Sequence, residues 1–325
     1  MKLPKVTIGI PCFNAERWLG ECVQSALEQT WQNKEIIVVD NGSTDGSRDI
    51  IHQFGDRISS VVISERGANR ARNEILRRST GDWIQYLDAD DYLLPDKLTS
   101  QLEEGFAGTE SMGAKELPEV GVLYSPVLIE EHGNASISEI DRNLDLAAQW
   151  ISWQLPQTGA CLWHKNTLEN LGGWNEKMPC CQEHELYLRA IEAGVHFQFT
   201  PTARAVYRIW SDETLCRKDP LLVIRTRTEL IDQMLAWLGR NGRLMQSHTE
   251  VAGKAFFEMA RTWARHDLDQ ATLYLKEKQT RRLLHLSGRA APPFYRVCFN
   301  LFGFKNAERL AKFLRNRKST EKLIH

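Results

Sequence analysis

Short apolar runs alternate with segments of helical periodicity through the first hundred residues. The apolar runs predict buried strands at 6–10, 35–40, 58–64 and 83–87. Between them, apolar residues at helical spacing predict helices at 15–29, 45–54 and 67–79. Asn14 has the residue type of a helix N-cap and is expected to cap the first helix. This alternation is typical of βαβ units, so we predict an α/β fold, with a mostly parallel sheet covered by helices on both faces.

The pattern becomes less regular after residue 100. Further strands are predicted at 120–131, 196–200 and 203–209, with another apolar stretch at 158–165 and a helix over 182–194. From Pro220 onward the periodicity is helical, in three or four segments. We therefore predict one α/β domain over 1–215 and a helical C-terminal region over 216–325.

Charge is balanced over the whole chain but not along it. The 41 Lys and Arg residues face 42 Asp and Glu, which argues against a nucleic-acid partner. Residues 276–318, however, contain twelve basic residues opposed only by Glu277 and Glu308. This segment also carries aromatic and leucine side chains. It fits either an amphipathic element on an anionic membrane or the solvated face of a packed helical subdomain.

The cysteine pattern and the hydropathy limit where the protein acts. Seven cysteines without a CxxC spacing argue against a disulfide framework or a zinc site. No run approaches the roughly 20 apolar residues that a membrane-spanning helix needs. The N-terminal apolar stretch is also too short for a signal peptide. We expect a cytoplasmic protein that is soluble or peripheral on the inner face of the membrane.

Three carboxylates directly follow the apolar run at 83–87: Asp88, Asp90 and Asp91. In open α/β sheets, ligands bind outside the carboxyl ends of the strands, where this cluster would lie. Oxygen ligands suit Mg²⁺ or Mn²⁺, which take one or two carboxylates and complete their shell with water and substrate phosphates. Turn and helix-capping roles explain a single aspartate such as Asp91 but not all three.

Asp40 and a group of arginines are expected near the same edge of the sheet, and each can be interpreted as structural or as ligand-binding. Asp40 ends the strand at 35–40, as a turn residue or as an acceptor for an N–H group of a nucleobase. The predicted helix at 67–79 and the loop before it are rich in arginine, which forms solvated helix faces but also binds diphosphates. Spacing alone does not select among these arginines, which are Arg66, Arg70, Arg72, Arg77 and Arg78.

Five segments together resemble the inverting glycosyltransferases of family 2, which have the GT-A fold. In chain order they are VTIGIPCFN (6–14), EIIVVDNGSTDGS (35–47), ARN (71–73), GDWIQYLDADDYLLPDKL (81–98) and GGWNE…QEHELYLRAIEAG (172–194). The resemblance implies transfer from a nucleotide-sugar donor of the UDP type, with Mg²⁺ or Mn²⁺. It further implies a saccharide or lipid-linked acceptor and a role in cell-surface polysaccharide or glycoconjugate synthesis. The donor half would span about 1–100 and the acceptor half about 101–215.

The resemblance assigns the donor site residue by residue. Pro11, Phe13 and Asp40 would line the base pocket, and Arg72 would help to hold the nucleotide. Asp88 and Asp90 match the DxD pair that contacts the ribose and the metal, and Asp91 lies beside them.

The chain departs from the family pattern at two places. Aligning on LYLR puts Gln182 at the first position of an acidic pair and Glu183 at the second, where the family has its aspartate base. Glu183 is therefore the expected base, and Glu185 is the alternative, although it is also placed to pair with Arg189 at i,i+4. Arg208 would contact the diphosphate. Trp210 stands where many relatives have histidine; an indole cannot ligate a metal, so it would stack on a sugar or pack.

Other classes of protein remain open at this point. A non-catalytic nucleotide-sugar-binding scaffold would agree with the departures at Gln182 and Trp210. A metal-dependent phosphatase or phosphotransferase could use Asp88 as nucleophile, but such motifs normally follow the first strand. A nucleotidyltransferase ranks lower because no glycine-rich loop lies near the N-terminus.

Overall fold

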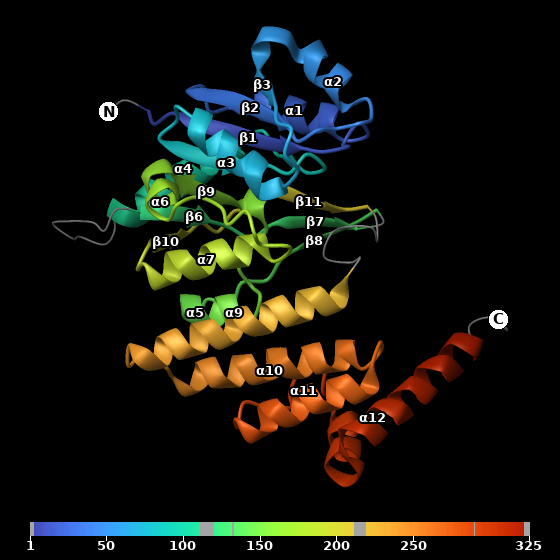
Figure 1. The fold of residues 1–325 in the computed structure, drawn as a ribbon. Coiled ribbons are helices and arrows are strands. Elements are labelled where there is room, and N and C mark those ends of the chain that lie inside the picture. The colour runs from blue at the N-terminus through green and yellow to red at the C-terminus, as the bar shows by residue number, and fades with distance from the viewer. Residues whose placement is uncertain (1–2, 111–119, 132, 211–218, 289, 322–325) are drawn as a thin grey trace. The chain divides into compact units, whose positions relative to one another are not determined.

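The computed structural model describes residues 3–110, 120–131, 133–210, 219–288 and 290–321 (Figure 1). The chain forms two compact units. The first comprises Met1–Asp141 and Gln154–Asp212, and the second comprises Arg142–Trp153 and Glu213–His325. The sequence analysis places all of 1–215 in one domain, whereas the structure groups 142–153 with the C-terminal helices.

A seven-stranded sheet forms the centre of the first unit. Its strands lie in the order β10 (His196–Phe199), β6 (Val120–Tyr124), β9 (Cys161–His164), β4 (Trp83–Tyr86), β1 (Val6–Cys12), β2 (Lys34–Asp40) and β3 (Ser59–Val62). Only β9 runs antiparallel to its neighbours, while the pairings of β1, β2, β3 and β4 are parallel. The predicted α/β fold with a mostly parallel sheet is confirmed.

Helices cover both faces of this sheet. They include α1 (Leu19–Leu27), α2 (Ser47–Phe54), α3 (Ala68–Arg78) and α4 (Lys97–Glu110). Ile8 and Ile10 of β1 share a buried apolar cluster with Leu19 of α1. The intervening Gly9 faces α3, where a Cβ atom would come within 2.2 Å of Ile75. Because neighbouring strand residues point to opposite faces, α1 and α3 lie on opposite sides of β1.

The helix start predicted at Asn14 is wrong. Helix α1 begins at Leu19, and Trp18 at its N-cap makes no capping bond through its side chain. Asn14 instead adopts a left-handed backbone conformation with φ 49°. Its Oδ1 atom accepts the backbone N–H of Thr44 at 2.8 Å, so its side chain joins two loops rather than capping a helix.

A second, four-stranded sheet carries the segment after the acidic cluster. Its order is β5 (Tyr92–Leu93), β11 (Ala205–Ile209), β7 (Leu128–Glu131) and β8 (Asn134–Ile137). The strand predicted at 120–131 is thus two strands, β6 and β7, in different sheets. Pro126 lies between them and has no N–H for a sheet ladder. The pairing of β5 with β11 brings residues near Asp91 beside residues near Arg208.

The remaining elements of the first unit are α6 (Lys165–Asn170), α7 (Gln182–Glu192) and the short 3₁₀ turns η1 (Gly55–Arg57) and η2 (Thr158–Ala160). The second unit contains α5 (Leu146–Ile151), α9 (Pro220–Arg240), α10 (Gln246–Trp263), α11 (Leu268–Thr280) and α12 (Pro293–Glu321). Asp145 caps α5, and its carboxylate binds His248 of α10 at 2.8 Å. Gly303 interrupts α12 with φ 73°. Within the described residues, no helix has both the length and the apolar character that crossing a bilayer requires.

Candidate functional site

The turn between β4 and β5 holds the three predicted carboxylates, and their environments differ. Asp91 is buried, and its Oδ1 accepts the backbone N–H of Arg208 at 2.8 Å. Burial, reinforced by the charges of Asp90 and Asp88, raises the pKa of Asp91 well above its usual range. The Asp91 side chain therefore joins β11 to the turn, a long-range role different from the turn or capping role expected from sequence.

Asp88 forms an ion pair with Arg72 of α3. Arg72 Nη2 donates to Asp88 Oδ1 at 2.7 Å, and the guanidinium lies 4.6 Å from the ring centroid of Trp174. Its Nη1 atom also donates to Gln182 Oε1 at 2.8 Å. Burial acts to lower the pKa of Arg72, but the charges of Asp88 and Glu183 raise it overall. The fold thus gathers residues from α3, the acidic turn and the start of α7.

Burial separates Arg72 from the other arginines of residues 66–78, all of which the structure describes. Arg72 is 4% exposed, whereas the other four are partly or fully exposed. Arg77 and Arg78 both pair with Glu74 of the same helix. Spacing could not select the buried arginine, because the selection depends on which side of α3 meets Asp88.

Asp90 is in contact with the end of β11. Its Oδ2 accepts the indole N–H of Trp210 at 3.0 Å, and its backbone carbonyl accepts Nη1 of Arg208 at 3.1 Å. Burial, followed by the charge of Asp88, raises the pKa of Asp90. Asp88 and Asp90 therefore form a crowded pair of oxygen donors in which negative charge is incompletely compensated.

Arg208, expected to contact a diphosphate, is packed between two aromatic rings. Its guanidinium lies 4.3 Å from the ring centroid of Trp18 and 4.9 Å from that of Tyr92. It also donates to Glu21 Oε2 at 2.9 Å. The sequence analysis missed these neighbours, because Trp18 there belongs to an apolar helical stripe and nothing in the spacing links it to residue 208.

The predicted base-pocket residues lie at one edge of the sheet. In the parallel register Pro11 is opposite Val39 and Cys12 is opposite Asp40. Both oxygens of buried Asp40 have partners, the N–H of Ser43 at 2.9 Å and Nε of Arg48 at 2.7 Å. Asp40 thus closes its turn, and contact with a base would use its remaining lone pairs. Phe13 is 45% exposed, with the guanidinium of Arg66 5.1 Å from its ring centroid.

Two glutamates open α7 and have different partners. Glu183 is partly exposed, and its Oε1 accepts the hydroxyl of Thr158 at 2.8 Å. Both carboxylate oxygens of Glu185 accept N–H groups of Arg189 at 2.9 Å. Arg189 also donates to the carbonyl of Gly173. Glu185 is thus bound into the i,i+4 pair expected from sequence, whereas the partner of Glu183 is a neutral hydroxyl group.

The donor set bears on metal binding. Within the described ranges, no group of three or more His, Cys, Asp or Glu residues could hold a metal ion. Two carboxylates alone fit an oxygen-preferring cation that takes its other ligands from water and phosphates. Burial, followed by the charge of Asp88, raises the pKa of Asp90, and a bound cation would favour the charged form of this carboxylate. Asp88 and Asp90 therefore fit Mg²⁺ or Mn²⁺ as a partial ligand set.

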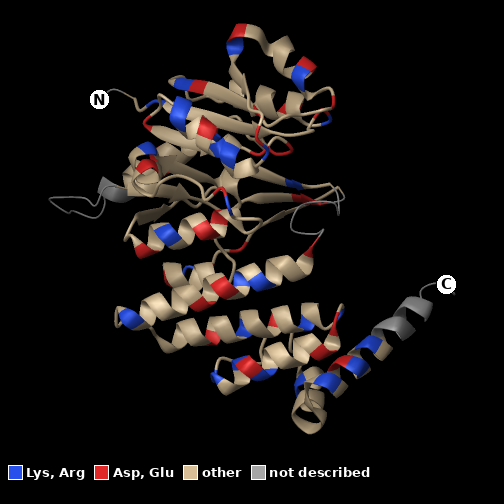
Figure 2. Ribbon diagram, in the orientation of Figure 1, with Lys and Arg blue, Asp and Glu red and all other residues tan. Residues whose placement is uncertain are grey.

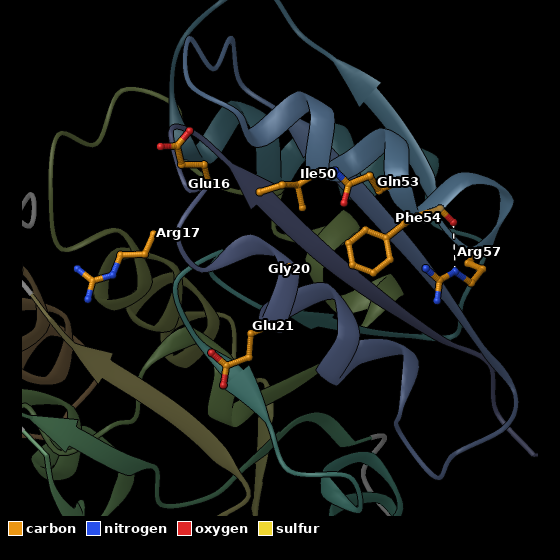
Figure 3. A pocket seen from close by; sticks show the side chains of 8 residues that line it. All are labelled: Glu16, Arg17, Gly20, Glu21, Ile50, Gln53, Phe54 and Arg57. Atoms are coloured by element: carbon orange, nitrogen blue, oxygen red, sulfur yellow. Dashed lines mark hydrogen bonds between the residues drawn. The ribbon is translucent and has the colours of Figure 1, made fainter.

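A pocket of about 350 Å³ lies beside helix α1 in the first unit. Its lining comes from the start of α1 and the loop before it, and from α2 and η1: Glu16, Arg17, Gly20, Glu21, Ile50, Gln53, Phe54 and Arg57 (Figure 3). None of the predicted site residues lines it. The candidate site is the acidic turn with its neighbours, and the pocket adjoins it through Glu21, which accepts a hydrogen bond from Arg208.

Comparison with known proteins identifies relatives of the N-terminal region. The family model "Glycosyl transferase family 2" matches residues 7–108. An uncharacterized glycosyltransferase of Haemophilus influenzae is 40% identical over 106 residues, which are 31% of this chain and 42% of the relative. Chondroitin synthase of Escherichia coli is 26% identical over 206 residues, covering 59% of this chain and 27% of the relative. The chain spans less than half of the length of these relatives.

Two solved structures share the fold over most of the chain. S. aureus TarS 1–349 has a TM-score of 0.62 at 14% identity, covering 95% of this chain and 91% of TarS 1–349. The mannosyltransferase PcManGT from Pyrobaculum calidifontis was solved with GDP-Man and Mn²⁺. It has a TM-score of 0.53 at 17% identity, and the match covers 94% of this chain and 86% of PcManGT. At these identities the likeness concerns the fold alone.

Proposed function

We propose, from the match of residues 7–108 to the model of glycosyltransferase family 2 and from the site geometry, that the chain transfers a sugar from a nucleoside-diphosphate donor to a hydroxyl group. The donor is of the UDP type and the acceptor is a saccharide or a lipid-linked saccharide. The observation that carries the proposal is the ion pair of buried Arg72 with partly exposed Asp88, beside Asp90 and at the carboxyl ends of parallel strands.

The names of similar proteins support the donor and the setting. TarS has also been solved with UDP-GlcNAc, and PcManGT with GDP-Man and Mn²⁺. A poly(ribitol-phosphate) β-glucosyltransferase of Bacillus spizizenii is 38% identical over 96 residues. A role in the synthesis of a cell-surface polysaccharide or glycoconjugate agrees with these names.

The proposed reaction is a direct displacement with inversion. The acceptor oxygen forms a bond to C1 of the sugar while the bond from C1 to the diphosphate oxygen breaks. Glu183 takes the proton of the acceptor hydroxyl, and Thr158 orients this carboxylate through its hydroxyl group. Asp88 and Gln182 hold the guanidinium of Arg72, which would supply positive charge near the nucleotide.

Asp88 and Asp90 are the residues that would hold Mg²⁺ or Mn²⁺. When bound, the cation acts as a Lewis acid that stabilises charge on the leaving diphosphate. Asp91 stays with β11 and takes no part as a ligand.

Binding of donor and metal should stabilise the folded chain. At a ligand concentration 100 times its Kd, the free energy of unfolding should rise by about 2.7 kcal/mol. Thermal unfolding with UDP, GDP, TDP and CMP nucleotides and their sugars, each with and without Mn²⁺, measures this. Asp90→Asn should remove the Mn²⁺-dependent part of the shift. Absence of any shift in the wild-type protein would contradict the donor site and favour the phosphatase reading.

A non-catalytic scaffold is the second candidate function, favoured by Gln182. A carboxylate at that position would pair with Arg72, whereas the amide makes a neutral acceptor. Donor binding without transfer across a panel of acceptors would support this candidate.

The proposal includes peripheral contact with an anionic membrane through 276–318. Before its break at Gly303, α12 exposes three apolar side chains on one face, with 62% of Phe294, 55% of Val297 and 69% of Leu301 accessible. Beyond the break, Lys305, Arg309 and Lys312 recur at i, i+4 and i+7 (Figure 2). An apolar face next to cations is the pattern of helices that lie in an anionic interface.

Flotation with lipid vesicles tests this contact. The full chain should float with phosphatidylcholine vesicles that contain phosphatidylglycerol, and less with phosphatidylcholine alone. Changing Phe294, Val297 and Leu301 together to Ser should abolish flotation. Leu273→Ser is the matched control, because Leu273 on α11 is 59% exposed and lies outside this face. Equal flotation of the triple variant and the wild type would contradict the membrane contact.

A further inference from the structure

The indole of Trp210 is hydrogen bonded to the acidic turn. Trp210 directly follows β11, and its Nε1 donates to Asp90 Oδ2 at 3.0 Å. Two bonds from Arg208 join the same segment to the turn: its backbone N–H donates to Asp91 Oδ1 at 2.8 Å, and its Nη1 donates to the Asp90 carbonyl at 3.1 Å. The position from which Trp210 reaches the carboxylate is therefore set by the turn itself.

Neighbouring side chains restrict the indole ring. Its centroid lies 6.0 Å from that of Trp18, with the planes tilted by 53°. The guanidinium of Arg17 lies 4.3 Å from the Trp18 centroid and 6.0 Å from the Trp210 centroid. Although 43% of Trp210 is exposed, its hydrogen bond to Asp90 Oδ2 restrains the rotamer of that carboxylate. Trp210 stands where many family members have a histidine, and here it contributes an indole N–H that binds Asp90 as well as an apolar ring.

We propose that Trp210 is a positioning residue that orients Asp90 toward the divalent cation. The inference rests on the proposed function, in which Asp90 is a metal ligand. The indole N–H is a donor only, so Trp210 acts through Asp90 and is not a ligand itself. A carboxylate oxygen has two lone pairs, so Oδ2 can accept this N–H and keep one pair for another contact. Hydrogen-bond partners of this kind orient metal ligands, and their loss typically weakens metal affinity by about 10–100-fold.

Titration of Mn²⁺ into the full chain tests the proposal, with free Mn²⁺ measured by its electron paramagnetic resonance signal. The titration is run without nucleotide, with UDP and with GDP. Trp210→Phe should weaken Mn²⁺ binding by about 10–100-fold. Trp18→Phe is the matched control, because within the described residues the indole N–H of Trp18 has no hydrogen-bond partner. It keeps an aromatic ring beside Trp210 and removes no hydrogen bond, so it should weaken Mn²⁺ binding less than Trp210→Phe does.

A double-mutant cycle provides the second measurement. In the Asp90→Asn background, Trp210→Phe should have no further effect on Mn²⁺ binding, since the carboxylate that it orients is gone. Unchanged affinity in Trp210→Phe alone, or equal weakening in both Trp→Phe variants, would overturn the positioning role. If the wild-type protein binds no Mn²⁺ under any condition, the metal assignment of the proposed function fails as well. If the wild type binds Mn²⁺ and Trp210→Phe binds it equally well, the positioning role fails but the proposed function stands.

Discussion

Replacing Glu183 with Gln should lower the rate of sugar transfer by about 10²–10⁴-fold, because the change removes the group that we propose takes the proton of the acceptor. The amide keeps the size of the side chain and can still accept the Thr158 hydroxyl, which lies 2.8 Å from Oε1. Donor affinity should stay near the wild-type value, since Arg72, Asp88 and Asp90 are unchanged. Measuring kcat and the Kd of the donor separately tests both statements.

Glu185→Gln is the matched control on the same helix. It weakens the pair with Arg189 and should reduce the free energy of unfolding by on the order of 1 kcal/mol, since these side chains are only partly exposed. The folded variant should retain its rate of transfer. A large loss of rate in Glu185→Gln together with an active Glu183→Gln would move the base to Glu185.

Lys97→Met should stabilise the first unit, most strongly at and below neutral pH. Lys97 is 1% exposed, and its Nζ donates to Gln85 Oε1 inside the core. Burial lowers the pKa of Lys97 from 10.5 to about 7, with only a weak opposing effect of Cys161. A shift of this size corresponds to a cost on the order of 5 kcal/mol for the charged form. The lost bond to Gln85 would offset about 1 kcal/mol of the gain.

The sign of the pH dependence follows from proton binding. Between pH 7 and 10.5 the unfolded chain holds a proton on Lys97 that the folded chain has released, so this group makes stability rise with pH. The advantage of Lys97→Met over the wild type should therefore be largest at pH 7 and shrink toward pH 10. Denaturant unfolding of both proteins across this range measures the difference. A difference independent of pH would contradict the buried, neutral lysine.

Lys278 supplies the contrasting case. It is also 1% exposed, but its Nζ pairs with Asp232 at 2.9 Å. Lys278→Met leaves that carboxylate without this partner and should destabilise the protein. Two equally buried lysines thus give opposite results, because only one of them has a carboxylate beside it.

The sequence predicted the parts of the fold that depend on local pattern. Short apolar runs located β1, β2 and β4, and their parallel arrangement placed Asp40 and Asp88 at the same edge. The i,i+4 spacing predicted the pair of Glu185 with Arg189. Each of these features depends on residues close together in the chain or on a general rule of sheet topology.

Features that depend on distant residues were not predictable in this way. The packing of Arg208 between Trp18 and Tyr92 joins three separate elements. The bond from Trp210 to Asp90 spans 120 positions. Asn14 has the right residue type for a helix cap, but it adopts a left-handed backbone conformation in a loop and binds the backbone N–H of Thr44 instead. The roles of Asp40, Arg72 and Glu183 in binding and chemistry stay predictions.

The second unit is built from two separate segments of the chain, 142–153 and 213–325, and this affects how the chain folds during synthesis. Helix α5 packs against α9 and α10, which the ribosome makes roughly 70–100 residues later, or about 5–20 s at the usual rate of elongation. Until then Trp150 and Ile151, both fully buried in the finished protein, lack the surface that covers them. Nascent chains that stop near residue 215 would expose this short apolar helix. Chaperone demand should therefore peak midway through translation, before α10 emerges.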